Sequence, residues 1–310
     1  MIVVDGLTKR YGRRTVVDRL SFTVRPGTVT GFLGPNGAGK STTMRMIVGL
    51  DRPDAGRVLI EGARYDELPH PSSVVGTLLD AGWVRPTFTA RTHLRWMASL
   101  TRTPPERADE VLEAVGLAPV ARKRVGDFSL GMRQRLGIAT ALLGRPHVLL
   151  LDEPMNGLDP EGIHWVRRFL RESAAEGRTV LVSSHLLAEM TLTADELVVI
   201  GEGRLIAQGG VREFIEEAVR PSVVVRALEA GRFEGLLRRL GLDVRGAPDG
   251  TLNIAGVSST RIGEIALEHG FVLSELRTDH GSLEEAFMER TREAVEYRSS
   301  AGAVPQGGAA

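Results

Sequence analysis

The sequence contains no cysteine, and its formal net charge is zero. The lack of cysteine excludes disulfide bonds, thiolate metal sites and a cysteine nucleophile, and it is consistent with a reducing cytoplasm. The balanced charge gives no global basic field of the kind that collects nucleic acid. We therefore expect no nucleic-acid partner.

Long apolar runs are missing as well. The longest, around Val148–Leu151, ends at two carboxylates, whereas a membrane-spanning helix needs about 20 predominantly apolar residues. The stretch Met1–Arg10 has no apolar run of the kind found in signal peptides. We expect any role at a membrane to be exercised from the aqueous side, through partners.

With 310 residues, the chain is long enough for one large domain and a smaller one. Strand-like runs open the sequence, a block of helical periodicity covers about 89–145, and strands and helices then alternate. Such alternation predicts an α/β domain over 1–218 whose largely parallel sheet is covered by helices, with a helical insert. The expected strands are Met1–Val4, Val16–Val24, Val29–Leu33, Arg57–Ile60, Val148–Asp152, Thr179–Ser183, Leu197–Ile200 and Arg204–Ala207. The expected helices are Lys40–Leu50, Thr89–Leu100, Pro105–Val115, Leu130–Leu143, Glu161–Glu176 and Leu186–Thr191.

The pattern restarts near Pro221 in the order β-α-β-β-α-β, which predicts a small ferredoxin-like α+β domain over 219–291. The expected strands are Ser222–Leu228, Leu242–Gly246, Thr251–Ala255 and Val272–Arg277, and the expected helices are Gly231–Leu240, Thr260–Glu268 and Ser282–Arg290. The remaining residues, 292–310, are mostly small and polar and are predicted to be disordered.

The strongest chemical signal is a glycine-rich loop between a predicted strand and a predicted helix, which is the context of a P-loop. The loop is Gly34, Pro35, Asn36, Gly37, Ala38, Gly39, Lys40 and Ser41, followed by Thr42. Its glycines let backbone N–H groups surround phosphate oxygens at the positive end of a helix. We expect these residues to bind ATP, with Lys40 on the β- and γ-phosphates and Ser41 on Mg²⁺.

A second signal is the apolar strand that ends in Asp152 and Glu153. Carboxylates at the end of a buried strand are costly unless their charge is used. Asp152 is expected to hold Mg²⁺ through water, and Glu153 to act as general base on the attacking water. An acidic surface turn is the alternative, which the P-loop in the same chain disfavours. The two motifs together predict a P-loop NTPase.

The segment Phe128–Arg135 indicates which family of NTPases this is. It resembles the ABC signature, Leu-Ser-Gly-Gly-Gln-x-Gln-Arg, at Ser129, Gly131, Gln134 and Arg135. Leu130 and Met132 depart from it, in a variant that resembles bacterial exporter ATPases of the daunorubicin and bacitracin type. Ser129 and Gly131 would head a helix whose hydroxyl and N–H groups face a γ-phosphate. A merely capped amphipathic helix is the alternative reading.

Further matches to this family follow in its order along the chain. Asn156–Asp159 takes the place of the D-loop, so Asp159 is an expected nucleotide-site residue, and His185 takes the place of the switch histidine that senses the γ-phosphate. Tyr11 resembles the aromatic residue that stacks on adenine. Asp80 stands where the family has a glutamine that touches Mg²⁺ and the membrane partner. It is either a working substitute or an ordinary loop aspartate.

The resemblance covers about 1–217 and implies an ABC ATPase core with an antiparallel β subdomain and a helical insert. It further implies an ATPase, with Lys40, Glu153 and His185 as catalytic residues, that works as a nucleotide-sandwich dimer of two copies. The dimer would drive export of a small molecule through separately encoded membrane permeases, at the cytoplasmic face of the membrane. The alternatives are an importer subunit, a soluble ABC ATPase acting on DNA or ribosomes, and a non-hydrolytic regulator, against which Glu153 argues.

Overall fold

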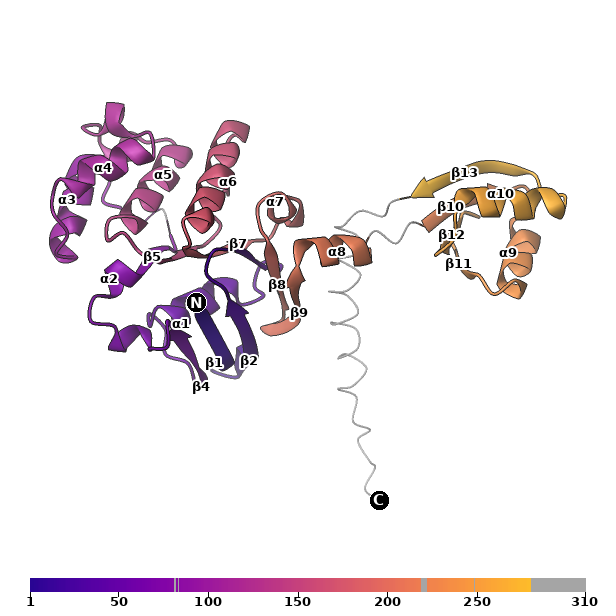
Figure 1. The fold of residues 1–310 in the computed structure, drawn as a ribbon, viewed down its shortest axis with the longest axis horizontal. Coiled ribbons are helices and arrows are strands. Elements are labelled where there is room, and N and C mark those ends of the chain that lie inside the picture. The colour runs from indigo at the N-terminus through magenta and orange to yellow at the C-terminus, as the bar shows by residue number, and fades with distance from the viewer. Residues whose placement is uncertain (81, 83, 219–221, 248, 280–310) are drawn as a thin grey trace, which may run out of the picture. The chain divides into compact units, whose positions relative to one another are not determined.

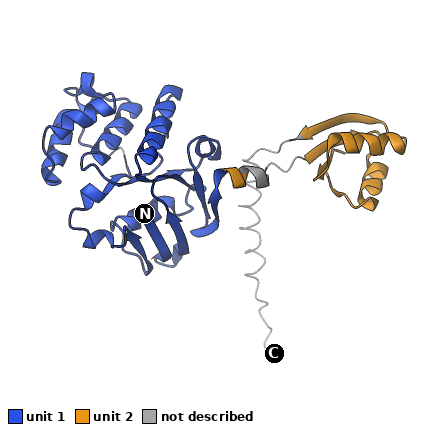
Figure 2. Cartoon of the chain, in the orientation of Figure 1, with its two compact units in different colours: residues 1–211, 293–310 blue, residues 212–292 orange. Residues whose placement is uncertain are grey.

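The computed structural model describes residues 1–279, apart from 81, 83, 219–221 and 248. The chain divides into two compact units, one of residues 1–211 with 293–310 and one of residues 212–292 (Figure 2). The predicted helix Ser282–Arg290 and the predicted disordered tail lie outside the described residues. In the described part, no helix is both long enough and apolar enough to span a membrane.

A six-stranded sheet forms the centre of the first unit, in the order β5-β6-β7-β3-β8-β9 (Figure 1). Its five pairs are parallel except for β8 and β9, which form an antiparallel hairpin. Every residue of β3, β6 and β7 is buried, which explains their largely apolar sequences. The strands are β3 (Val29–Leu33), β5 (Val75–Leu78), β6 (Val148–Leu151), β7 (Thr179–Ser184), β8 (Glu196–Gly201) and β9 (Arg204–Gly210).

A separate three-stranded antiparallel sheet, in the order β2-β1-β4, contains β1 (Ile2–Tyr11), β2 (Arg14–Val24) and β4 (Ala55–Ile60). Helix α1 (Lys40–Ile47) contributes Met44 to the apolar core that this sheet shares with β3 and β6. Phe22 and Phe32 meet in that core with their ring centroids 5.3 Å apart. The α/β core and the antiparallel subdomain predicted from the sequence are confirmed.

Three helices form the insert: α3 (Ala90–Leu100), α4 (Arg107–Ala114) and α5 (Leu130–Ala141). Where the chain leaves α5, it packs backbone against backbone on the segment that leads into and begins β5. A Cβ atom at Gly76 would lie 2.2 Å from the carbonyl oxygen of Ala141, and one at Gly144 would lie 2.0 Å from that of Ser72. Only glycine allows these approaches, so we call this pair of contacts the glycine joint.

The remaining helices of the chain up to residue 218 are α2 (Pro71–Val74), α6 (Pro160–Ala175), α7 (Leu187–Thr191) and α8 (Val211–Ala218). Short 3₁₀ turns lie at Tyr65–Glu67, Ala118–Val120 and Val125–Asp127. Helix α6 packs against β3 and β7. Three elements, α2, α8 and β5, have no counterpart in the sequence-based prediction.

Several predicted boundaries differ from those observed. Strand β1 continues to Tyr11 and β2 begins at Arg14, because backbone pairing carries the hairpin through polar residues that the apolar pattern does not mark. Helix α1 ends at Ile47 instead of Leu50, since Gly49 adopts a left-handed φ of 69° and donates its N–H to Met46.

The second unit carries a four-stranded antiparallel sheet in the order β11-β12-β10-β13. This arrangement, with one helix after β10 and one after β12, is the ferredoxin-like order that the sequence predicted. The rings of Phe233 and Phe271 meet in its core at 4.9 Å. The elements are β10 (Ser222–Ala227), α9 (Ala230–Arg239), β11 (Asp243–Gly246), β12 (Leu252–Ala255), α10 (Ser259–Glu268) and β13 (Leu273–Asp279).

His93 makes the stability of the insert depend on pH. It is 1% exposed on α3, and its Nε2 lies 3.1 Å from Thr140 Oγ1 on α5. Burial lowers the pKa of His93 from 6.5 to about 4. The folded protein therefore keeps a neutral ring, while the unfolded chain takes up a proton below pH ~6.5, so stability is lost as the pH falls from there towards 4.

We predict that the wild-type protein loses about 2 kcal/mol of unfolding free energy between pH 8 and pH 5 relative to His93→Gln, which has no charge to take up. Urea unfolding of both proteins at each pH measures the difference. Parallel pH profiles would show that His93 is not held neutral by its surroundings.

Candidate functional site

The P-loop lies between β3 and α1, and its glycines pack closely against the backbone of β8 and β2. A Cβ atom at Gly34 would lie 2.6 Å from the carbonyl oxygen of Ile200. Gly39, which precedes α1, has a φ of 101°, and a Cβ atom there would lie 2.8 Å from the carbonyl oxygen of Val16. Glycine is therefore required at both positions. The loop presents Pro35, Asn36 and Gly37 to solvent.

Helix α1 begins at the P-loop with three residues that the sequence assigned to the nucleotide. Lys40 is only 6% exposed, and its Nζ donates to the carbonyl oxygens of Gly34 at 2.7 Å and Pro35 at 3.4 Å. Ser41 is exposed and Thr42 is half-buried in the same turn. The positive end of a helix and a buried ammonium group thus lie together, which is an arrangement suited to phosphate.

Glu153 connects the P-loop to the neighbouring strand ends. Its Oε1 lies 3.5 Å from Lys40 Nζ, and its Oε2 lies 2.9 Å from His185 Nδ1. Its backbone is held at a φ of 48°, in the left-handed region that non-glycine residues rarely adopt. The structure therefore brings the three predicted catalytic side chains into one chain of contacts, with Glu153 in the middle.

Ser183, which the sequence interpretation used only to locate His185, fixes both carboxylate residues. It is fully buried on β7, and its hydroxyl donates to Asp152 Oδ1 while accepting from the Glu153 N–H at 2.9 Å. Gln134 adds a weaker contact, from Nε2 to the Glu153 carbonyl oxygen at 3.4 Å. No sequence motif indicates the Ser183 contacts, because they depend on the pairing of β6 with β7.

Asp80 lies two residues after β5, next to the end of β6. The Asp152 N–H donates to the carbonyl oxygen of Leu78 at 2.7 Å, so the backbone places Asp80 near the predicted metal ligand. Its exposed carboxylate accepts from the Gly82 N–H at 2.6 Å and makes no ion pair with Lys40 among the described residues. A role for Asp80 in the nucleotide site therefore stays a prediction, since its carboxylate bonds to the Gly82 N–H and to no predicted site residue that the structure describes.

Tyr11 ends β1 and is 50% exposed. Its hydroxyl lies 3.2 Å from Asp51 Oδ2, and Lys9 Nζ lies 5.3 Å from its ring centroid. These contacts fix the ring while leaving area on which a base could stack.

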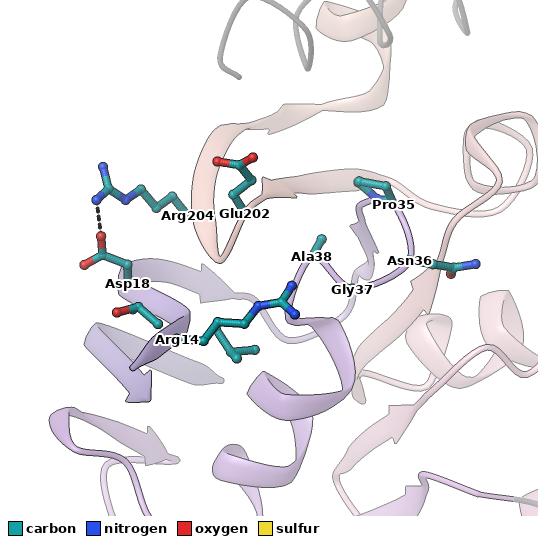
Figure 3. A pocket seen from close by; sticks show the side chains of 10 residues that line it. Arg14, Asp18, Pro35, Asn36, Gly37, Ala38, Glu202 and Arg204 are labelled. Carbon is teal, nitrogen blue, oxygen red and sulfur yellow. Dashed lines mark ion pairs between the residues drawn. The ribbon is translucent and has the colours of Figure 1, made fainter. Parts of the chain in front are cut away.

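A cavity of about 540 Å³ lies beside the P-loop, and the side chains of Arg14 and Glu202 flank Ala38 in it (Figure 3). The sequence analysis missed Arg14 and Glu202, which come from β2 and from the turn between β8 and β9. That turn is tied to the P-loop, because the Gly203 N–H donates to the Ala38 carbonyl oxygen at 3.0 Å. Arg204 and Asp18, which form an ion pair, also line this cavity.

The signature residues lie at the start of α5. The exposed Ser129 caps this helix by accepting from the Met132 N–H at 3.2 Å. The Leu130 side chain packs directly on Gly157 of the D-loop. A Cβ atom at Gly157 would lie 2.3 Å from Leu130 Cδ2. Asp159 caps α6 through the Gly162 N–H at 2.9 Å. In the described part of the chain, neither Ser129 nor Asp159 hydrogen-bonds to the P-loop.

The donor set suits a cation bound together with a nucleotide better than a cation alone. Ser41 offers an exposed hydroxyl in the first turn of α1, and Asp152 offers a carboxylate at the neighbouring strand end. The described residues hold no group of three or more His, Asp or Glu that could bind a metal. Mg²⁺ with phosphate oxygens among its ligands is consistent with this set, since Mg²⁺ is often held by one or two carboxylates and substrate phosphates.

Comparison with known proteins agrees with this geometry. The ABC transporter family model matches residues 17–156, and a model for a domain of unknown function matches 221–284. An AAA-domain model, described as putative AbiEii toxin of a type IV TA system, matches 124–191.

The chain is 35% identical to the uncharacterized ABC transporter ATP-binding protein YhcH of Bacillus subtilis, over 96% of this chain and 97% of that protein. It is also 35% identical to the bacitracin transport ATP-binding protein BcrA of Enterococcus faecalis, over 93% and 95% respectively. A solved dimeric structure of a bacterial ABC transporter cassette matches with a TM-score of 0.62 and 23% identity, over 68% of this chain and 99% of that chain, and it shows the shared fold.

The chain therefore belongs to the ATP-binding subunits of ABC transporters. The members of this family are P-loop ATPases, so the chain binds nucleotide and ATP hydrolysis is its expected activity.

We predict that Ser183→Ala destabilises the protein by about 1–3 kcal/mol, because it leaves the Glu153 N–H without its acceptor and Asp152 without its donor. Ser99→Ala is the matched control, since that exposed hydroxyl bonds only to the carbonyl of its own helix. Chemical unfolding measures both variants. Equal stability of the two would mean that Ser183 does not support the strand ends.

Proposed function

We propose that this chain hydrolyses MgATP as one half of a nucleotide-sandwich dimer, which drives the export of a small molecule through separate membrane permease subunits. The observation that carries the proposal is the chain of contacts from Lys40 through Glu153 to His185 at the edge of the parallel sheet. These three groups have the charges needed to bind a γ-phosphate and to activate water beside it.

In the structure, the carboxylate of Glu153 contacts two groups that a γ-phosphate in the P-loop would also contact. Lys40 and His185 both face it, at 3.5 and 2.9 Å. An ATP γ-phosphate in the P-loop would compete for Lys40 and His185 and release the carboxylate towards water. Binding of ATP would then replace the Glu153 carboxylate by the γ-phosphate as the partner of Lys40 and His185, and the same step would free Glu153 to act as general base.

For hydrolysis, the P-loop N–H groups and Lys40 would hold the phosphates, and Ser41 and Asp152 would hold Mg²⁺, which supplies positive charge. Glu153 would orient a water molecule and accept its proton as the water oxygen bonds to the γ-phosphorus. The bond from that phosphorus to the ADP oxygen breaks in line, giving ADP and phosphate. His185, in contact with Glu153, would contact the γ-phosphate and respond to its departure.

The position of the signature supports a dimer. Ser129 and Gly131 head α5 and make no hydrogen bond to the P-loop of their own chain among the described residues. A γ-phosphate held from one side only would stay open to water and be poorly neutralised. A second copy presenting its Ser129 helix end would meet both needs. The dimeric bacterial cassette, which shares the fold, gives a precedent.

An apolar patch on the insert supports docking to a membrane subunit. Trp96 and Leu100 are 48% and 61% exposed and lie one turn apart on α3. Phe88 packs its ring edge-to-face with Trp96 at 6.3 Å. Exposed apolar clusters of this kind mark interaction sites. A permease docked here would hold the chain at the cytoplasmic face of the membrane.

Export is supported by the signature variant and by the bacitracin transport relative.

We predict that Glu153→Gln retains ATP binding but lowers ATPase turnover by about 10²–10⁴-fold, because the positioned base is lost. Lys40→Ala should instead abolish ATP binding, since it removes the buried charge on the phosphates. Steady-state ATPase assays and calorimetric ATP titration separate these outcomes. Turnover of Glu153→Gln within tenfold of wild type would contradict the role of Glu153.

We also predict that Glu153→Gln dimerises with MgATP but not with MgADP, because only the γ-phosphate is shared with the second signature. Adding Ser129→Arg should abolish the dimer and leave ATP binding mostly intact. Ser99→Arg, at an exposed serine on α3, is the control for added charge and should dimerise normally. Light scattering during size-exclusion chromatography gives the answer. A monomer under MgATP in Glu153→Gln would count against the sandwich.

A further inference from the structure

A second cavity, of about 640 Å³, lies where the helical insert meets the core, at the glycine joint. It is bounded by residues that precede β5, by the connection between α3 and α4, and by residues that precede β6. Since the P-loop and Glu153 lie at the opposite, carboxyl ends of the parallel strands, this cavity is separate from the nucleotide site. We call it the joint cavity.

Three arginines line the joint cavity, and they have more donors than acceptors. Arg107 Nη1 and Arg145 Nη2 share one oxygen, Glu110 Oε2, at 2.6 and 3.4 Å. Hydrogen bonding from Arg107, with a smaller effect of Arg145, lowers the pKa of Glu110, so this carboxylate is ionised. One negative charge thus serves two guanidinium groups.

Two donors are left over even so. Arg107 Nε is buried without a hydrogen-bond partner in the described part of the chain. Arg102 makes no hydrogen bond or ion pair with any described residue. Since Arg107 Nε is closed off from solvent, the guanidinium groups that are open to the cavity are those of Arg102 and Arg145. The acidic neighbours are Glu106 and Glu110, so the three arginines leave the cavity with an excess of positive charge.

Backbone geometry at this cavity is also unusual. Arg102 and Arg145 have φ values of 53° and 54°, in the left-handed region. The other described non-glycine residues with such values are Arg19, Glu61, Glu153 and Glu202. Arg102 adopts this conformation where α3 ends, because the Thr103 N–H donates to the Ala98 carbonyl oxygen at 2.8 Å, as at many helix C-termini.

Hydroxyl groups complete the lining. Thr101 and Thr103 lie with their Oγ1 atoms 3.0 Å apart on the insert side. Ser72 and Ser73 lie on the core side, next to the backbone contact of Gly144 with Ser72. The Thr101 and Ser73 hydroxyls donate to the carbonyl oxygens of Met97 and His70, at 3.0 and 2.8 Å, so their oxygens are left as acceptors for a ligand.

We propose that the joint cavity binds the phosphate group of a small phosphorylated molecule, or free phosphate. Guanidinium groups bind phosphate through paired hydrogen bonds, and Arg102 and Arg145, which are exposed at the cavity, supply the donors. The cavity is open to solvent, and its volume of about 640 Å³ suits a small polar molecule. Because Arg102 lies on the insert and Arg145 precedes β6 of the core, the ligand bridges the insert and the core.

The test uses the full-length chain with Lys40→Ala, which suppresses phosphate binding at the P-loop. Isothermal titration calorimetry is performed with inorganic phosphate, with glucose 6-phosphate and with acetate. Tighter binding of glucose 6-phosphate assigns the site to a phosphorylated molecule, and tighter binding of phosphate assigns it to the free ion. Absence of binding by both, or equal binding of acetate, overturns the proposal.

The site is located by adding Arg102→Asn and Arg145→Asn, because asparagine tolerates a left-handed φ. The pair should weaken phosphate-group binding by at least about tenfold. Arg168→Gln with Arg239→Gln removes the same charge from exposed helix surfaces and should have no effect. Arg102→Asn alone, at an exposed position, should weaken binding severalfold if the double variant fails to fold. Unchanged affinity in Arg102→Asn and in the folded double variant rules the site out.

Discussion

Lys40 is held beneath the P-loop with little access to water, and a buried ammonium group needs acceptors and negative charge. Here it has two loop carbonyls and the carboxylate of Glu153. The same carboxylate contacts His185. At the end of β6, Ser183 bonds to the Asp152 carboxylate and to the Glu153 N–H and so orients these two residues. The other parts of the site are arranged around this charge balance, because any phosphate that enters must replace Glu153 as the partner of Lys40.

The parts of the site that lie on one short segment could be predicted from the sequence. The P-loop, the carboxylates after β6 and the cap at Ser129 are each a local pattern whose chemistry is visible in consecutive residues. The α/β core and the ferredoxin-like order of the second unit were predicted for the same reason, since apolar periodicity records burial. The antiparallel subdomain was expected only from the resemblance to the family.

The features that escaped prediction depend on tertiary contacts. Strand β5 is four residues long and is defined by its pairing with β6. Ser183, Arg14 and Glu202 gain their places only when β6 lies beside β7 and the turn after β8 meets the P-loop. The left-handed backbone of Glu153 is likewise invisible in a sequence, because glutamate carries no preference for it.

The glycine joint fixes one end of the insert as a pivot. Ala141 closes α5 against Gly76, while Ser129 lies at the other end of the same helix, 12 residues away. At 1.5 Å per residue, that lever is about 18 Å long. A rotation of about 10° about an axis across the joint would move the first turn of α5 by roughly 3 Å, the length of one hydrogen bond. The end of the helix that carries Ser129 therefore has the longest travel, and a slight turn of the insert is enough to make or break its contacts.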